Sequence, residues 1–127
     1  MNSIYRFIIA LIACISVFAC SDEIMEKQRI PNKTGTIDAI LAIRETGATV
    51  ATPTEIYVVR NGEKPKGNPI FRADNVEGLV VTWSSESTLI IQAEKARVFL
   101  QTTNLTVDVP GRMEFPVKIK LAIKNLS

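Results

Sequence analysis

The chain has 127 residues, with 15 Lys and Arg against 13 Asp and Glu, so its net charge is only +2. This length supplies one domain with a single modest core, and the balanced charge supplies no basic surface for a nucleic-acid backbone. The chain has no histidine, which removes the commonest general base near neutral pH and the commonest nitrogen ligand of zinc.

The first segment of the chain is typical of an export signal. Residues 1–6 carry one positive charge, and residues 7–18 form an unbroken apolar run. A spanning helix needs about 20 apolar residues, so this run fits a secretory signal better than a stable anchor. Both cysteines, Cys14 and Cys20, lie in or beside this segment, and we therefore expect no disulfide bond in the folded region.

Val17, Ala19 and Cys20 resemble the lipobox of bacterial lipoproteins, in which a small residue directly precedes a cysteine. Phe18 is bulkier than the usual residue at its position. The resemblance implies cleavage between Ala19 and Cys20 and a lipid on Cys20, which then holds the protein to a bilayer. Cys14 has a similar local pattern, but cleavage there would leave an apolar start, whereas polar residues follow Cys20.

Two other interpretations of this segment stay open. Ordinary signal peptidase cleaves after Ala19 and leaves Cys20 unmodified, or the segment stays uncleaved as a weak anchor. Ser21 follows the cysteine at the position where Asp is associated with retention in the inner membrane of Gram-negative bacteria. We therefore expect a lipid-anchored protein of the cell envelope at the outer membrane, on its periplasmic or surface face.

Residues 20–36 are polar and are interrupted by Pro31, Asn32 and Gly35, which predicts a flexible tether. As a random coil, this tether would span roughly 20 Å and lift the domain above the headgroups. We therefore divide the chain into a signal at 1–19, a lipidated cysteine and tether at 20–36, and a β-rich domain at 37–127.

From residue 37 onward, apolar and polar residues alternate with the period of two that is typical of strands. The clearest case is the last one, in which the apolar residues Val117, Ile119, Leu121 and Ile123 alternate with Lys118, Lys120, Ala122 and Lys124. Further strands are predicted at 37–44, 55–60, 78–83, 88–93, 97–102 and 105–109, with turns at 61–62 and 84–87. The pattern predicts an all-β fold, a small antiparallel sandwich or rolled sheet of six to seven strands.

Part of the domain, residues 35–91, resembles a pattern in uncharacterised small bacterial lipoproteins. The matching segments are GTIDAIL at 35–41, GAT at 47–49, EIYVV at 55–59, Trp83-Ser84 and LII at 89–91. The chain departs from the pattern at residues 50–53, where an aromatic residue is usual. These proteins have no assigned activity, so the resemblance implies no site.

Lysines are the candidate contact residues. Lys118, Lys120 and Lys124 share one face of the last predicted strand, and Lys64 and Lys66 lie in an exposed loop rich in proline and glycine. The functional interpretation is attraction to anionic headgroups or polysaccharide. We favour the simpler interpretation, in which lysines on an edge strand prevent edge-to-edge aggregation.

Catalytic interpretations are weaker. A serine nucleophile needs an activating base, so we expect the serines between two predicted strands to form a turn; they are Ser84, Ser85 and Ser87. The acidic residues that would pair as in glycosidases are scattered, and we expect them on a solvated surface; they are Asp74, Glu77, Glu86 and Glu94.

The leading hypothesis is a non-enzymatic envelope lipoprotein that contacts a protein or a glycan through a sheet edge or through the loop at 61–69. We expect no catalytic residue, no metal, no cofactor and no nucleic-acid partner. One alternative is an immunity or exclusion lipoprotein that neutralises a competitor's effector in the periplasm. Another is a hydrolase that uses lysine or carboxylates.

Overall fold

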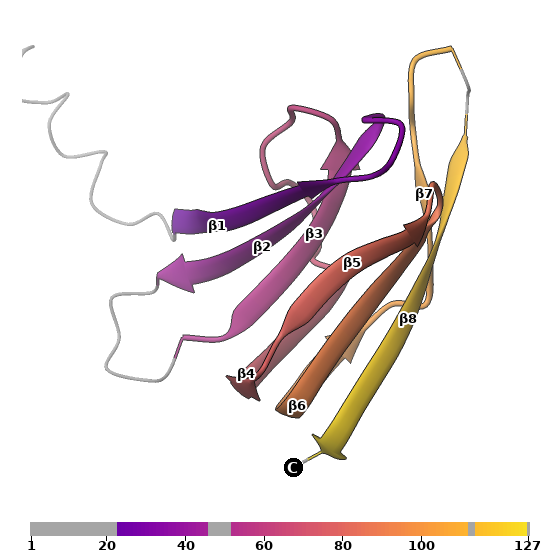
Figure 1. The fold of residues 1–127 in the computed structure, drawn as a ribbon. Helices are drawn as coiled ribbons and strands as arrows, with labels where there is room; N and C mark the ends of the chain where they lie inside the picture. Colours follow the sequence, from indigo (N-terminus) through magenta and orange to yellow (C-terminus); the bar gives the residue numbers. More distant parts are fainter. Residues whose placement is uncertain (1–22, 46–51, 112–113, 127) are drawn as a thin grey trace, which may run out of the picture.

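A computed structural model of the chain describes residues 23–45, 52–111 and 114–126 (Figure 1). These residues form one mixed sheet of eight strands and no helix, so the all-β prediction is confirmed. Accordingly, no described segment is a helix long and apolar enough to cross a membrane. The predicted export signal and Cys20 lie outside the described residues.

The strands in chain order are β1 (Glu23–Pro31), β2 (Ile37–Glu45), β3 (Thr54–Arg60), β4 (Phe71–Glu77), β5 (Val80–Ser85), β6 (Thr88–Gln101), β7 (Asn104–Val107) and β8 (Phe115–Leu126). Their order in the sheet is β1-β2-β3-β4-β6-β8-β7, and β5 pairs with β6. Among the strands described, the β6–β8 pair is parallel and the others are antiparallel. The sequence pattern missed β1 and β4, which explains why it predicted fewer strands.

β1 overturns the prediction of a flexible tether over residues 23–36. It pairs with β2 from Glu23 opposite Glu45 to Pro31 opposite Asp38, with one irregularity between Glu26 and Gln28. This bulge breaks the alternation of apolar and polar residues, which hides the strand from a period-of-two search. Backbone hydrogen bonds to β2 hold a segment whose side chains are mostly exposed.

β4 and β5 together form one long arm that pairs with β6. β4 pairs with residues 95–101 in the second half of β6. β5 pairs with residues 88–92 in the first half of the same strand. Asn75, near the end of β4, and Gly78, between the two strands, have positive φ values of 51° and 64°. The two strands predicted at 88–93 and 97–102 are a single strand, β6.

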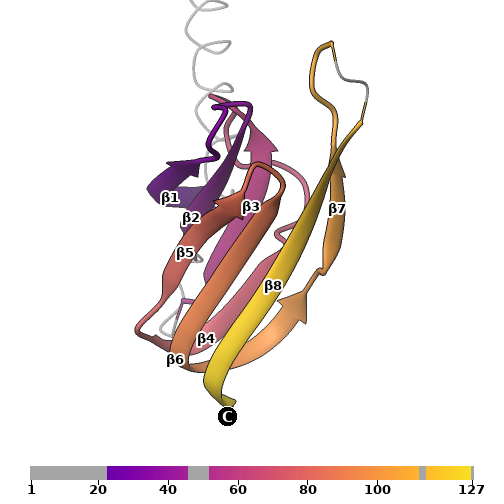
Figure 2. The same ribbon diagram turned by 45° about the vertical axis from the view of Figure 1, so that its right-hand side comes forward.

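The sheet is rolled, so that β1, β2 and β3 face β5, β6, β8 and β7 across the core (Figures 1 and 2). One cluster of buried apolar side chains joins both halves; its members include Ile37, Ile56, Phe71, Leu89, Ile91, Val117 and Ile119. This arrangement confirms the rolled sheet, but the eight strands and the parallel β6–β8 pair differ from the six to seven antiparallel strands that were predicted. β2 and β3 are also buried on their outer face, where Ile40, Ala42, Tyr57 and Val59 form a second cluster.

Side-chain hydrogen bonds close the roll where β1 lies near the β5–β6 turn. Trp83 Nε1 donates to the carbonyl oxygen of Ile30 at 2.8 Å. Asn32, only 4% exposed, donates from Nδ2 to the carbonyl oxygen of Glu86 at 2.9 Å. Its Oδ1 accepts from the N–H of Thr36 at 2.9 Å. β1 is therefore attached to both halves of the sheet.

Candidate functional site

The loop at residues 61–69 joins β3 to β4. Most of its residues are exposed, as the sequence predicts. It begins with an Asn61-Gly62 turn, in which Gly62 has a φ of 84°. Glu63 N donates to the carbonyl oxygen of Arg60 at 3.1 Å, which closes the turn. The predicted turn at 61–62 is thus confirmed.

A buried carboxylate holds this loop. Asp38 on β2 is 0% exposed, and its oxygens accept from Asn61 Nδ2 at 2.9 Å and from Gly62 N at 3.0 Å. Arg29 on β1 donates to Asp38 Oδ2 at 2.7 Å and also to the carbonyl oxygen of Glu63 at 2.7 Å. Asp38 and Arg29 therefore fix the start of the loop relative to the sheet.

The hydrogen bonds determine the protonation state of Asp38. Burial by itself would raise the pKa of this carboxyl group, because it disfavours the charged form. The donors on Arg29, Gly62 and Asn61 outweigh burial and hold the pKa of Asp38 below its ordinary value. Asp38 is therefore a charged structural residue at neutral pH.

Ion pairs within the loop order its next residues. Glu63 lies between Arg60 at 2.6 Å and Lys66 at 2.7 Å. The hydrogen bond from Lys66, with the charge of Arg60, holds the pKa of Glu63 below its ordinary value. Lys66, a predicted contact residue, is thus partly used inside the loop, whereas Lys64 is exposed beside it.

A groove of about 210 Å³ lies between this loop and β7; its lining residues include Arg60, Glu63 and Lys66 on one wall and Leu105, Thr106 and Asp108 on the other. In the part of the chain that the structure describes, β3 pairs with β4 through residues 54–56 alone, and β7 pairs with β8 alone. The facing edges of β3 and β7 approach within 8 Å between Cα atoms. The groove is therefore an open seam of the rolled sheet.

The spacing of this seam limits what can enter it. Neighbouring strands lie about 4.8 Å apart, so an inserted strand would need roughly 9.6 Å between β3 and β7. Where Cα atoms of β3 and β7 approach within 8 Å, the seam is narrower than that strand needs, and these two described strands do not pair with each other. Small-molecule pockets usually measure about 300–1,000 Å³, so this groove fits a side chain of a partner better than a whole ligand.

A second buried carboxylate, Glu55 on β3, has a structural role. It accepts from Arg44 at 3.1 Å, from Arg72 at 2.9 Å and from the hydroxyl of Tyr57 at 3.3 Å. Sequence reasoning missed both Asp38 and Glu55. The available signal was an acidic residue inside a strongly apolar strand pattern, where an unpaired charge would be costly.

The structure separates the predicted lysines into two surroundings. β7 pairs only with residues 115–118 of β8, so Lys120 and Lys124 belong to a half of β8 that forms a described sheet edge. Lys118 lies between Thr88 of β6 and Asn104 of β7. Edge protection therefore explains Lys120 and Lys124 but not Lys118.

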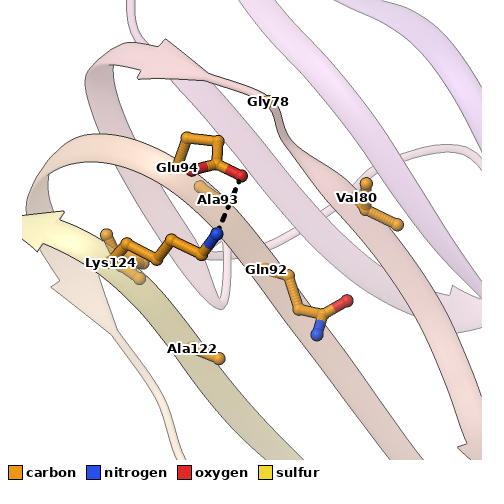
Figure 3. A pocket seen from close by; sticks show the side chains of 8 residues that line it. Gly78, Val80, Gln92, Ala93, Glu94, Ala122 and Lys124 are labelled. Carbon is orange, nitrogen blue, oxygen red and sulfur yellow. Dashed lines mark hydrogen bonds and ion pairs between the residues drawn. The ribbon is translucent and has the colours of Figure 1, made fainter.

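The hollow beside Lys124 has a volume of about 410 Å³ and a floor of small residues, Gly78, Ala93 and Ala122 (Figure 3). Lys124 Nζ pairs with Glu94 at 3.3 Å across it. Both side chains are largely exposed, so the pair is a solvated surface contact.

The serines and acidic residues considered as catalytic candidates belong to strands, turns and ion pairs of the fold. Ser84 and Ser85 belong to β5 and only residues 86–87 form the turn, which shortens the predicted turn at 84–87. Asp74 accepts from Arg97 Nε at 2.8 Å, and Glu86 accepts from Thr34 at 3.2 Å. Within 23–45, 52–111 and 114–126, no three His, Cys, Asp or Glu side chains gather as metal ligands.

The fold and the groove define a small all-β protein, a single rolled sheet with an ordered loop beside an open seam. No family model, curated protein or solved structure matches the chain.

Proposed function

We propose that the protein is a lipid-anchored module of the bacterial cell envelope that binds a protein partner through the 61–69 loop and the adjoining groove. One observation carries the binding proposal: a loop fixed by the buried Asp38 borders a groove between two strand edges. A preorganised loop loses little conformational entropy on binding, and the groove beside it fits a side chain of a partner.

The anchoring part of the proposal is supported by the sequence. Val17 and Ala19 precede Cys20 in the lipobox pattern, after an apolar run of signal length. Mass spectrometry of the native N-terminus tests it directly. We expect a mature chain that begins at Cys20 and carries acyl chains, and we expect a Cys20→Ser variant to leave the membrane fraction.

Site-specific cross-linking tests the binding surface. A photo-reactive residue replaces Lys64 in the loop or, as the matched control, the exposed Lys120 on β8. We expect a discrete protein adduct from position 64 in intact envelopes and none from position 120. A Lys66→Glu change should reduce that adduct several-fold, because it repels Glu63 and disturbs the loop.

Two results would reject the binding surface. One is an equal set of adducts from positions 64 and 120, and the other is no adduct from position 64. An adduct with a secreted toxin would assign the protein to the immunity class of lipoproteins, since such a partner is neutralised by direct contact.

A further inference from the structure

The start of β1 limits how far the domain can lie from a lipid on Cys20. β1 is paired with β2 from its first residue, Glu23 opposite Glu45. Only Ser21 and Asp22 separate Glu23 from Cys20. Three Cα–Cα steps of about 3.8 Å span at most about 11 Å, whatever conformation these residues adopt.

That distance is comparable to the thickness of the headgroup layer. The hydrocarbon core is about 30 Å thick and the whole bilayer about 40–45 Å, which leaves roughly 5–8 Å of headgroups on each side. A lipid on Cys20 places this residue at the headgroup level. Glu23 would therefore lie in the headgroups or within a few ångströms of their surface.

The strand ends beside Glu23 would share this position; they are residues 23–25 of β1, 43–44 of β2 and Thr54 of β3. Pairing keeps them together, because Met25 lies opposite Ile43, which in turn lies opposite Thr54. We call these residues the anchor end. Met25 is 36% exposed there and offers an apolar side chain to the lipid surface.

The opposite end of the same strands carries the candidate binding site. β1 has nine residues, so its far end lies at most about 26 Å from Glu23 at about 3.3 Å per residue. The β1–β2 turn and the 61–69 loop are joined there by a hydrogen bond from Asn61 N to the carbonyl oxygen of Thr36 at 3.0 Å. In Figure 1 the start of β1 and the β1–β2 turn lie at opposite ends of that strand.

We infer that the folded domain rests directly on a phospholipid surface through its anchor end and directs the 61–69 loop away from the bilayer. The inference rests on the proposed lipid at Cys20. In this arrangement the orientation of the domain relative to the bilayer is restricted, whereas a domain on a flexible tether would rotate freely. Partners of the 61–69 loop would therefore approach from the aqueous side.

Single-site labels on the full lipidated protein test this orientation. In the proposed mature chain the Cys20 sulfur carries the lipid through a thioether and Cys14 has been removed with the signal, so an introduced cysteine is the single free thiol. Met25→Cys and Lys64→Cys variants receive the same fluorophore, in vesicles of phosphatidylethanolamine and phosphatidylglycerol with a quencher on the headgroup. We expect quenching several-fold stronger at position 25 than at position 64.

A second variant measures the effect of the short connection. Twelve Gly and Ser residues are inserted between Asp22 and Glu23, and quenching at position 25 should then fall towards the value at position 64. Unchanged tryptophan fluorescence and circular dichroism show that the variants are folded.

The outcomes separate this inference from the proposed function. An acylated Cys20 with equal quenching at both positions, or with no effect of the insertion, overturns the seated orientation and leaves the anchor intact. An unmodified Cys20 in the native protein overturns the proposed anchor and the orientation with it.

Discussion

At the scale of single residues, two buried carboxylates organise the outer side of β2 and β3. Asp38 and Glu55 are both 0% exposed, and each accepts at least three hydrogen bonds. A buried ion pair adds little net stability, but loss of one partner leaves a costly uncompensated group. The two carboxylates differ in what they hold in place, because of the two only Asp38 bonds to the 61–69 loop.

Asp38→Asn should lower the free energy of unfolding by about 2 kcal/mol, because the partly buried Arg29 loses its carboxylate partner. Urea unfolding at neutral pH measures the change as a lower midpoint at constant slope. Asp74→Asn is the matched control, since Asp74 pairs with the largely exposed Arg97 and should change the midpoint little. Equal effects of both variants would contradict the role assigned to Asp38.

Acid should remove the contribution of Asp38. The pKa of Asp38 is lower in the folded protein than in the unfolded chain, where it is about 3.9. Its stabilisation is therefore fully present above about pH 5 and is lost as the pH falls through the folded-state pKa. Unfolding measured between about pH 7 and pH 2.5 should show the gap between wild type and Asp38→Asn narrowing below about pH 4. A difference in unfolding free energy that stays constant down to low pH would contradict a stabilising ion pair between Arg29 and Asp38.

At the scale of elements, the kink between β4 and β5 decides the path of the long arm along β6. The arm pairs with β6 on both sides of Gly78, but the register shifts between Asp74 and Glu77. A Cβ on Gly78 would lie 2.7 Å from Cγ of Glu94. Its positive φ therefore favours glycine there, and a Cβ would in addition displace the largely exposed side chain of Glu94.

Gly78→Ala should lower the free energy of unfolding by about 2–3 kcal/mol, measured by urea denaturation. About 1–2 kcal/mol comes from the left-handed backbone and the remainder from the contact with Glu94. Gly67→Ala separates these effects, because Gly67 has a φ of 71° but no atom within 4 Å of its added Cβ. Equal losses in the two variants would remove the argument from crowding.

At the scale of the whole molecule, the rolled sheet has one principal core shared by its two halves. Ile37 and Ile56 from one half belong to the same cluster as Leu89 and Val117 from the other. Neither half can bury its apolar face alone, so we expect one cooperative unfolding transition.

Trp83, the only tryptophan of the chain, reports on this cooperativity because its indole bonds to Ile30 where the roll closes. Urea transitions followed by tryptophan fluorescence and by far-ultraviolet circular dichroism should coincide. Fluorescence that changes at lower urea would show instead that β1 detaches before the rest of the sheet unfolds.

The strand pattern and the surface lysines were visible in the sequence because both depend on local order. Alternation located β2, β3, β5 and β8 to within a few residues, and the Asn61-Gly62 turn follows from local backbone preference. β1 was invisible for the opposite reason: it is held by pairing with β2, while its own side chains are mostly exposed. β4 likewise lacks regular alternation, because its register shifts against β6.

The sequence by itself determined the fold class, because a period of two over short apolar segments is compatible with strands and not with helices. Only the tertiary structure decided that Asp38 controls the 61–69 loop, that β3 and β7 border an open groove, and that residues 23–31 belong to the sheet. These features join residues far apart in the chain. Their energies come from hydrogen bonds and burial that exist only once the strands have been paired.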